Sequence, residues 1–295
     1  TSVCNYARKS IPPHILPYGA DTLKGCGCIS DIFVTIKSMI PKIIHYCWFG
    51  RNPLPPLAQE CIASWRKYLP DYEIKEWNED NFNVNIIPYT AEAYRQKKYA
   101  FVSDYARFWI LHQFGGIYFD TDVEVIRPMD DIIAAGNFMG FEIDPDGENT
   151  PGRYAPRYCF SVALGLGFGM EASHPFLKKM LDIYAGMKFE LPPEDISWYK
   201  TIVAYTTEAL CKEGLQNVSG IQSVMGINIY PHEYFAPINV LTSRLNITPN
   251  TRTVHRYMGS WGTGKRSLKD RMRRLVPEVL FVIYNKIKRR RYRIK

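Results

Sequence analysis

The sequence predicts a mixed α/β domain, and three observations lead to this prediction. Strand-like and helix-like segments alternate from residue 42 onward, which is the pattern of an α/β domain. The 295 residues are 46% apolar and 22% charged, so the chain can bury a full core and is too apolar for bulk disorder. An acidic pair follows a short apolar strand near the centre of the sequence. It therefore lies at the carboxyl end of that strand, where open α/β sheets bind their ligands.

The first half of the alternating pattern predicts four strands and two helical segments. The prolines between residues 53 and 56 mark a loop before the first helix. The second helical segment is long enough for two helices, which we expect to meet near Lys98, and Gly115-Gly116 ends it as a C-cap. The predicted elements are strand Lys42–Phe49, helix Leu57–Tyr68, strand Tyr72–Trp77, helical segment Ala91–Phe114, strand Ile117–Phe119 and strand Val123–Ile126.

The second half continues in the same way, with longer loops. Pro128 opens a helix, and residues 144–157 are polar and contain three prolines and two glycines, which predicts a loop. Residues 160–170 are glycine-rich and apolar. The remaining predicted elements are strand Asn137–Ile143, helices Pro175–Met187 and Ser197–Lys212, and strands Ile227–Tyr230 and Val254–Tyr257.

Charge and composition divide the chain into three parts. Residues 1–38 are broken by prolines and glycines and are expected to be an N-terminal appendage of unclear role. Residues 39–264 carry the α/β pattern. Residues 265–295 hold 13 basic and two acidic residues, so this segment alone accounts for more than the net charge of +8. The rest of the chain is slightly acidic.

The basic C-terminal segment carries one apolar stripe at helical spacing. Such a basic amphipathic helix predicts binding to an anionic membrane surface. A helix packed on the domain with a solvated basic end is the alternative. No nucleic-acid-binding motif accompanies the charge, so we expect no nucleic-acid partner. The stripe consists of Leu268, Met272, Leu275, Val276, Val279, Leu280, Ile283 and Ile287.

Seven scattered cysteines, an odd number, argue against a disulfide framework and favour reduced thiols in the cytoplasm. No signal-like segment or membrane-length apolar run is present in the sequence. We therefore expect a cytoplasmic protein held peripherally on the inner face of the cytoplasmic membrane.

The acidic pair is Asp120 and Asp122, at i and i+2 after the short apolar strand. In extended backbone these two side chains would point to the same side. Paired carboxylates are ligands for Mn²⁺ or Mg²⁺, and such an ion would neutralise a diphosphate leaving group. A polar turn with no ligand is the alternative reading of the pair.

Asp104 and Arg107 lie three residues apart in an otherwise apolar helix and therefore face the same way. Burying both would be costly unless they are paired or bound to a ligand. Spacing alone leaves two possibilities open: a structural ion pair, or a pair that binds a sugar hydroxyl and a phosphate.

The segment Ser103–Asp122, SDYARFWILHQFGGIYFDTD, resembles the core motif of glycosyltransferase family 32, the DXD-containing sugar transferases that include capsular polysaccharide enzymes and initiating mannosyltransferases. Four further blocks resemble this family in the same order: Ile40–Gly50, Ser64-Trp65, Pro70–Glu73 and His255–Trp261. The blocks span roughly three-quarters of the chain. The family is also distantly similar to the glucosylating clostridial toxins.

This resemblance implies a GT-A type fold, with a Rossmann-like mixed sheet flanked by helices, and it assigns roles to individual residues. Asp120 and Asp122 would bind the metal and the donor diphosphate, and Asp122 would be the more direct ligand. Asp104 and Arg107 would hold the donor sugar. The remaining implied residues are Trp48 near the base or ribose, and His255 and Trp261 closing over the diphosphate.

His255 suits a third metal ligand, although it could equally be an exposed surface histidine; Trp48 and Trp261 could be ordinary core residues. His45 is expected to be a core histidine. The toxins supply a carboxylate from the closing segment, and this sequence has none between Arg252 and Trp261.

The leading interpretation is a metal-dependent, retaining glycosyltransferase. It would move a sugar from a nucleotide-sugar, UDP-linked rather than GDP-linked, to a saccharide or lipid-linked oligosaccharide in surface polysaccharide synthesis. Same-face attack is favoured over a carboxylate nucleophile, for which Glu142 and Asp144 are the candidates. The alternatives are a nucleotide-sugar hydrolase or phosphodiesterase, and a non-catalytic sugar- or nucleotide-binding module.

Overall fold

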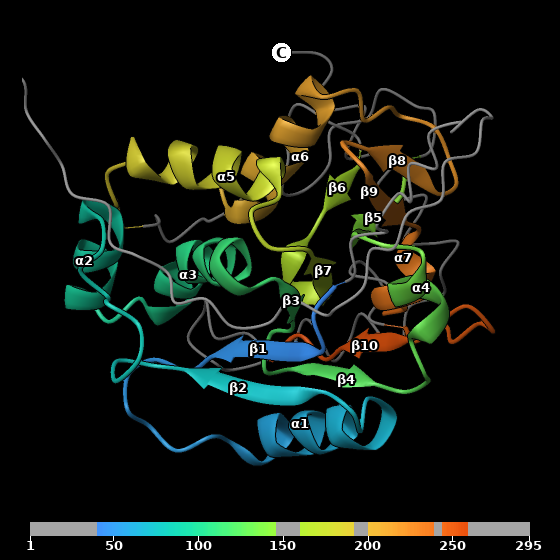
Figure 1. Ribbon diagram of the computed structural model, residues 1–295, viewed down its shortest axis with the longest axis horizontal. Helices are drawn as coiled ribbons and strands as arrows, with labels where there is room; N and C mark the ends of the chain where they lie inside the picture. Colours follow the sequence, from blue (N-terminus) through green and yellow to red (C-terminus); the bar gives the residue numbers. More distant parts are fainter. Residues whose placement is uncertain (1–39, 146–159, 192–199, 239–243, 259–295) are drawn as a thin grey trace, which may run out of the picture. The chain divides into compact units, whose positions relative to one another are not determined.

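The computed structural model describes residues 40–145, 160–191, 200–238 and 244–258 (Figure 1). The strands are β1 (Ile43–Cys47), β2 (Glu73–Trp77), β3 (Gly116–Tyr118), β4 (Val123–Val125), β5 (Phe138–Ile143), β6 (Ser161–Val162), β7 (Phe168–Met170), β8 (Gln222–Val224), β9 (Ile227–Tyr230) and β10 (Thr253–His255). The helices are α1 (Pro56–Tyr68), α2 (Pro88–Arg95), α3 (Tyr99–Phe114), α4 (Asp130–Ala134), α5 (Pro175–Ala185), α6 (Ile202–Lys212), α7 (His232–Phe235) and the 3₁₀ helix η1 (Leu164–Leu166).

The central sheet is mixed and has the strand order β2-β1-β3-β7-β5-β9-β8, with β6 paired to β5. Strands β2, β1 and β3 are parallel neighbours, and so are β5 and β9. Strand β7 runs antiparallel to both β3 and β5, so these two strands point in the same direction. The carboxyl ends of β1, β3, β5 and β9 therefore all lie at one edge of the sheet, here called the carboxyl edge.

Both faces of the sheet are buried. Alternate side chains of a strand point to opposite faces, and each face packs against its own apolar cluster. In β1, Ile44 and Tyr46 belong to an apolar cluster on one face, while Cys47 belongs to the cluster on the other. Helices α1, α4 and α7 cover the first face, and α2, α3, α5 and α6 cover the second (Figure 1). The fold class predicted from the sequence, a mixed sheet flanked by helices, is confirmed.

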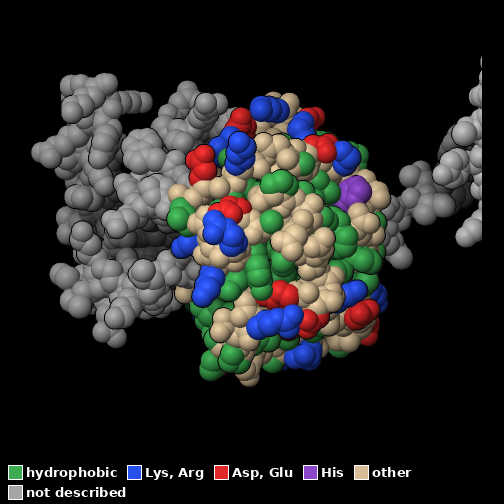
Figure 2. All heavy atoms as spheres, turned by 90° about the vertical axis from the view of Figure 1, so that its left-hand side faces the viewer, with side chains coloured by type: hydrophobic (Ala, Val, Ile, Leu, Met, Phe, Trp, Pro, Cys, Tyr) green, Lys and Arg blue, Asp and Glu red, His purple; other side chains and the backbone are tan. Residues whose placement is uncertain are grey.

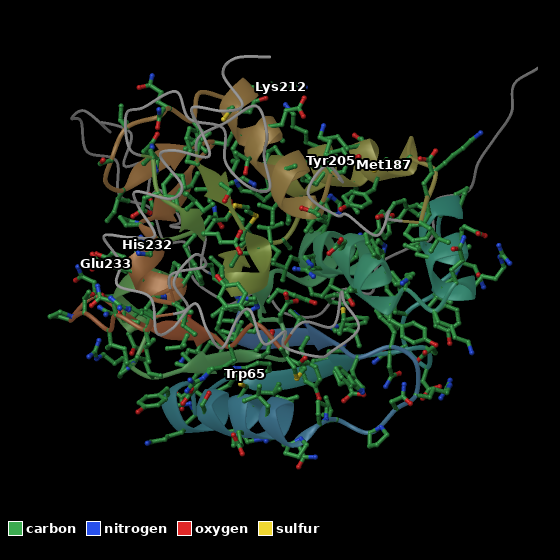
Figure 3. All side chains as sticks on the ribbon, turned by 180° about the vertical axis from the view of Figure 1, so that it is seen from behind. Trp65, Met187, Tyr205, Lys212, His232 and Glu233 are labelled. Atoms are coloured by element: carbon green, nitrogen blue, oxygen red, sulfur yellow. The ribbon has the colours of Figure 1, made fainter. Side chains whose placement is uncertain are left out.

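A second, two-stranded sheet lies next to α1 and joins two distant parts of the chain. Strand β10 pairs antiparallel with β4, and His255 stands opposite Val123. On the α1 side, the indole N–H of Trp65 donates to the carbonyl of Val123 at 2.7 Å, and the hydroxyl of Ser64 accepts from the amide of Val125. Figure 3 shows Trp65 between α1 and the strands. Helix α1 thus fixes β4, the strand that follows the acidic pair.

Most predicted elements are present, with boundaries shifted by a few residues. The helical segment is split as expected, because Lys97 has a left-handed φ of 57° and Lys98 precedes α3. Gly115 caps α3 with φ 62° and donates to Leu111 at 2.8 Å. Helix α2 begins earlier than predicted, at Pro88, where proline suits the first turn. The sequence did not predict β6, η1, β7, β8 or α7, which are only two to four residues long.

Several expectations fall on residues outside the described ranges. They concern the appendage 1–38, most of the loop 144–157, the first three residues of the predicted helix 197–212, Trp261 and the basic segment 265–295. Within the described ranges, no helix combines the length and apolar composition needed to cross a bilayer. On the face shown in Figure 2, the described basic and acidic side chains are interspersed, as expected for a domain without a strong net charge of its own.

The Trp65 anchor can be tested by unfolding. We expect Trp65→Phe to lower the free energy of unfolding by about 1–3 kcal/mol, because the carbonyl of Val123 loses its buried donor. Urea denaturation measures this loss. Trp109→Phe is the matched control, because Trp109 is half-buried and its indole donates to no partner within the described residues. Equal losses in the two variants would contradict the anchoring role.

Candidate active site

The acidic pair lies in a tight turn at the carboxyl edge of the sheet. Strand β3 ends at Tyr118, and the amide of Val123 donates to the carbonyl of Asp120 at 3.0 Å, which closes a turn over residues 120–123. The expectation that Asp120 and Asp122 are in extended backbone is therefore wrong. The turn nevertheless brings the two carboxylates together, since one oxygen of each lies within 4.8 Å of the other.

Asp122 is held from the C-terminal side. Its carboxylate accepts from the amide of Met258 at 2.7 Å and lies 3.2 Å from Nε2 of His255. Its backbone carbonyl accepts from the amide of Arg256 at 2.8 Å. Burial disfavours the charged carboxylate, but His255 and the Met258 amide outweigh this effect and lower the pKa of Asp122 to about 2. Asp122 is therefore an ionised, rigidly oriented carboxylate.

His255 completes a set of three side chains that could hold a metal ion. One atom each of Asp120, Asp122 and His255 lies within 4.8 Å of the other two. The imidazole is largely buried, with 15% of the side chain exposed, and its Nδ1 is buried without a hydrogen-bond partner among the described residues. Two carboxylates and an imidazole form a donor set that suits Mn²⁺ or Mg²⁺, so the residues present fit a divalent cation.

A buried guanidinium connects this turn to helix α3. Arg107 lies 3.3 Å from Asp104 and 3.2 Å from Asp120, while its Nε donates to the carbonyl of Ser103 at 3.1 Å. The ring of Tyr118 lies beneath the guanidinium, 4.7 Å from its centre. Asp104 and Arg107 do form the ion pair considered from the sequence, and Arg107 also reaches the acidic pair. The structural ion pair and the ligand-binding pair, which spacing left as alternatives, are thus compatible.

The electrostatics of Asp104 follow from its burial. Burial is the main cause that raises the pKa of Asp104 to about 7, and Arg107 only partly opposes it. Its Oδ2 has no hydrogen-bond partner among the described residues. Burial and the neighbouring Asp122 also raise the pKa of Asp120, against the effect of Arg107. Because Asp104 is only 1% exposed, Oδ2 is a buried carboxylate oxygen without a partner among the described residues.

Gly165 lies directly against Asp120, and sequence analysis gave it no role. A Cβ atom at Gly165 would lie 2.3 Å from Oδ2 of Asp120, and one at Gly167 would lie 2.6 Å from the ring of Phe119. The 3₁₀ helix η1 can therefore lie on the acidic turn only because both positions are glycine. The glycine-rich segment 160–170 was the available signal, but composition alone does not show which residue the segment approaches.

The remaining sequence candidates have different positions. Trp48 follows β1 at the carboxyl edge, next to the strand that leads to Asp120, and its indole donates to the carbonyl of Asn52 at 2.6 Å. His45 is a core residue as expected: Nε2 lies 2.9 Å from the carbonyl of Gly115, and Nδ1 accepts from Trp77 at 3.0 Å. Burial lowers the pKa of His45 to about 4.

The structure thus brings together Asp104, Arg107, Asp120, Asp122 and His255, from three segments of the chain. Their roles in binding stay predictions. A protein-family model described as "Glycosyltransferase sugar-binding region containing DXD motif" matches residues 55–139. Residues 55–139 are thus similar to a DXD sugar-binding region. The matched residues include both aspartates of the turn as well as Asp104 and Arg107, and the resemblance seen in the sequence is confirmed.

The chain is also similar to curated proteins. It is 31% identical over 107 residues to Inositol phosphoceramide mannosyltransferase 3 of Schizosaccharomyces pombe, covering 35% of this chain and 30% of that protein. It is 25% identical over 162 residues to the Initiation-specific alpha-1,6-mannosyltransferase of Candida albicans, covering 48% and 41%. The matches thus span less than half of these relatives. Among solved structures, the PaToxG Glycosyltransferase is 19% identical, with a TM-score of 0.41 over 59% of this chain and 70% of that one.

The role of Gly165 can be tested without changing a polar group. We expect Gly165→Ala to weaken Mn²⁺ binding at least about tenfold by isothermal titration calorimetry, because the new methyl group must displace the carboxylate of Asp120. Gly186→Ala is the control, since a Cβ there meets only ordinary contacts at 3.7 Å or more. Equal Mn²⁺ affinities in both variants and the wild type would contradict the packing argument.

Proposed function

We propose that the protein is a divalent-metal-dependent glycosyltransferase that moves a sugar from a nucleoside diphosphate to a hydroxyl acceptor. The observation that carries the proposal is the convergence of Asp120, Asp122 and His255 beside Arg107. This convergence lies at the carboxyl edge of a mixed α/β sheet and falls largely within the DXD sugar-binding region.

Asp120, Asp122 and His255 would hold the cation. When bound, a divalent cation supplies positive charge that neutralises the diphosphate leaving group. The turn is suited to this task, because Asp122 is oriented by the Met258 amide and Asp120 is held near Arg107 and Gly165. A ligand set fixed before the donor arrives needs little rearrangement during the reaction.

Asp104 and Arg107 would bind the donor sugar and its phosphate. Arg107 carries a charge secured by two carboxylates, and Oδ2 of Asp104 accepts from, or when protonated donates to, a sugar hydroxyl. Transfer then breaks the bond between the anomeric carbon and the phosphate oxygen, and the electron pair leaves with the phosphate. The acceptor oxygen forms the new bond to the anomeric carbon and loses its proton.

We further propose retention of the anomeric configuration through same-face attack, in which the departing phosphate takes the acceptor proton. Glu142 and Asp144, at the end of β5, are the carboxylates that a double-displacement route would have to recruit. A covalent glycosyl-enzyme detected by mass spectrometry would contradict same-face attack.

The sequence and the relatives point to different nucleotide bases in the donor. The sequence alone favoured a UDP-sugar. The names of the fungal relatives, which include inositol phosphoceramide and initiation-specific mannosyltransferases, support mannose as the transferred sugar. We therefore propose GDP-mannose as the first donor to test, with UDP-glucose and UDP-galactose beside it.

For the acceptor we propose a saccharide or a lipid-linked glycan of surface polysaccharide synthesis. A relative named for inositol phosphoceramide supports an acceptor with a lipid part. We also propose that the basic segment 265–295 holds the protein on the inner face of the cytoplasmic membrane. That segment lies outside the described residues, so its sequence pattern is the support for this part.

Two alternatives differ in measurable ways. A nucleotide-sugar hydrolase or phosphodiesterase would use the same carboxylates but would release free sugar or sugar phosphate at a rate independent of any acceptor. A non-catalytic binding module would bind nucleotide-sugar without turnover. The similarity of residues 55–139 to a glycosyltransferase family model supports transfer over both.

Donor binding should depend on the metal. We expect Mn²⁺ with GDP-mannose or one of the UDP-sugars to raise the melting temperature, by about 2–4 °C for each kcal/mol of binding free energy at this chain size. Differential scanning fluorimetry, with and without EDTA, measures the shift. No metal-dependent stabilisation by any donor would contradict the proposed function.

The two aspartates of the turn should carry this effect. We expect Asp120→Asn and Asp122→Asn each to remove the Mn²⁺-dependent stabilisation and to lower sugar transfer by at least about a hundredfold, because each loses a charged metal ligand. Asp182→Asn, an exposed aspartate paired with Lys178, is the control and should behave as wild type. Unchanged donor binding in both turn variants would favour a binding module instead.

A further inference from the structure

A second histidine–aspartate pair lies at the carboxyl edge, formed by His232 and Asp144. Asp144 directly follows β5, and His232 is the first residue of α7, just after β9. Oδ2 of Asp144 lies 2.6 Å from Nδ1 of His232, and Oδ1 accepts from the backbone amide of His232 at 2.7 Å. The carboxylate therefore holds both the backbone and the imidazole ring of this residue. Figure 3 shows His232 and Glu233 at α7.

This pairing leaves one edge of the imidazole for another molecule. Because Nδ1 is bonded to Asp144, Nε2 is the remaining polar atom of the ring, and 40% of the side chain is exposed. The hydrogen bond to Asp144 is the main cause that raises the pKa of His232, and the charge of Glu233 adds a smaller effect. The Glu233 carboxylate itself accepts from Asn250 at 2.9 Å. Nε2 donates to a hydroxyl when the ring is protonated and accepts from one when it is neutral.

Topology places the pair on one side of the metal-ligating turn. The strand order β3-β7-β5-β9 separates His232 from the end of β3 by three strand spacings, roughly 14 Å. Thr253 links the two places, since its hydroxyl lies within hydrogen-bond distance of the carbonyls of Leu166, in η1, and Phe235, at the end of α7. His255 follows two residues later. The pair is thus joined to the same framework as the acidic turn.

We propose that Asp144 and His232 form an acceptor subsite, in which Nε2 of His232 hydrogen-bonds a hydroxyl of a sugar or cyclitol unit of the acceptor. The inference rests on the proposed function and deepens it. The separation from Asp120 is too long for a proton transfer at the anomeric carbon, and it matches a unit of the acceptor beyond the reacting hydroxyl. His232 is therefore a positioning residue for the acceptor.

The chemistry of the pair also indicates a neutral polyol rather than an anion. The Asp144 carboxylate lies 2.6 Å from Nδ1, and the charge of Glu233 adds to its effect, so a free phosphate is disfavoured beside the ring. A hydroxyl group carries no charge and can use Nε2 in either protonation state. A hexose and an inositol ring both present neighbouring hydroxyl groups, so the test titrates one compound of each kind.

The test follows the imidazole resonances of His232 by ¹H–¹³C NMR in the full chain, assigned through their loss in His232→Gln. Methyl α-D-mannopyranoside and myo-inositol are titrated separately, each with and without GDP and Mg²⁺, which is diamagnetic and does not broaden the resonances. We expect a saturable shift of the His232 resonances in one arm or both. Asp144→Asn should weaken that binding by about fivefold, because the ring loses its charged partner, while Glu233→Gln should leave it within about twofold.

The outcomes separate the subsite from the proposed function. A saturable shift that depends on Asp144 supports the subsite even if no nucleotide binds. Absence of nucleotide binding would count against the proposed transferase activity, but not against the subsite. His232 resonances that do not move in either arm overturn the subsite, even if Mn²⁺ and GDP stabilise the protein. A shift of equal affinity in wild type and Asp144→Asn would reduce the pair to a structural link between β5 and α7.

Discussion

The buried guanidinium of Arg107 is the interaction on which the site depends. A charged group inside an apolar helix costs several kcal/mol unless other charges compensate it, and here Asp104 and Asp120 lie on either side of it. Because one carboxylate belongs to α3 and the other to the turn after β3, the same guanidinium fixes both the charge balance and the position of the turn. The guanidinium also lies over the Tyr118 ring, and its Nε donates to the Ser103 carbonyl. Gly165 leaves room for the Asp120 carboxylate, because any side chain at this position would collide with it.

The two aspartates of the turn are held from opposite sides. Asp120 is held by α3, whereas Asp122 is held by the segment from His255 to Met258, far along the chain. Strand pairing between β10 and β4 brings that segment to the turn, and α1 supports β4 through Trp65. The metal-ligating set is therefore assembled by the fold, not by one local motif. On the far side of η1, Thr253 extends the same framework toward α7.

Sequence patterns predicted much of the fold and part of the site, for physical reasons that can be named. The break at Lys98 and the cap at Gly115 were visible because local backbone chemistry decides them. Asp104 and Arg107 stood out because charges are costly in an apolar helix. Gly165 and the His232–Asp144 pair were not identified, because their roles depend on contacts between residues 45 and 88 positions apart. The extended backbone expected at Asp120 was wrong for a different reason: a local hydrogen bond, from the amide of Val123 to the carbonyl of Asp120, closes a turn there.

The central claim is that Asp120, Asp122 and His255 together bind a divalent cation. Pulsed electron paramagnetic resonance of Mn²⁺ added to the full chain tests this claim most directly, since a coordinated imidazole gives a ¹⁴N modulation that carboxylates and water do not. The account predicts such a modulation in the wild type and its loss in His255→Gln, with it retained in His232→Gln. A Mn²⁺ signal without ¹⁴N modulation, or a modulation that persists in His255→Gln, would contradict it.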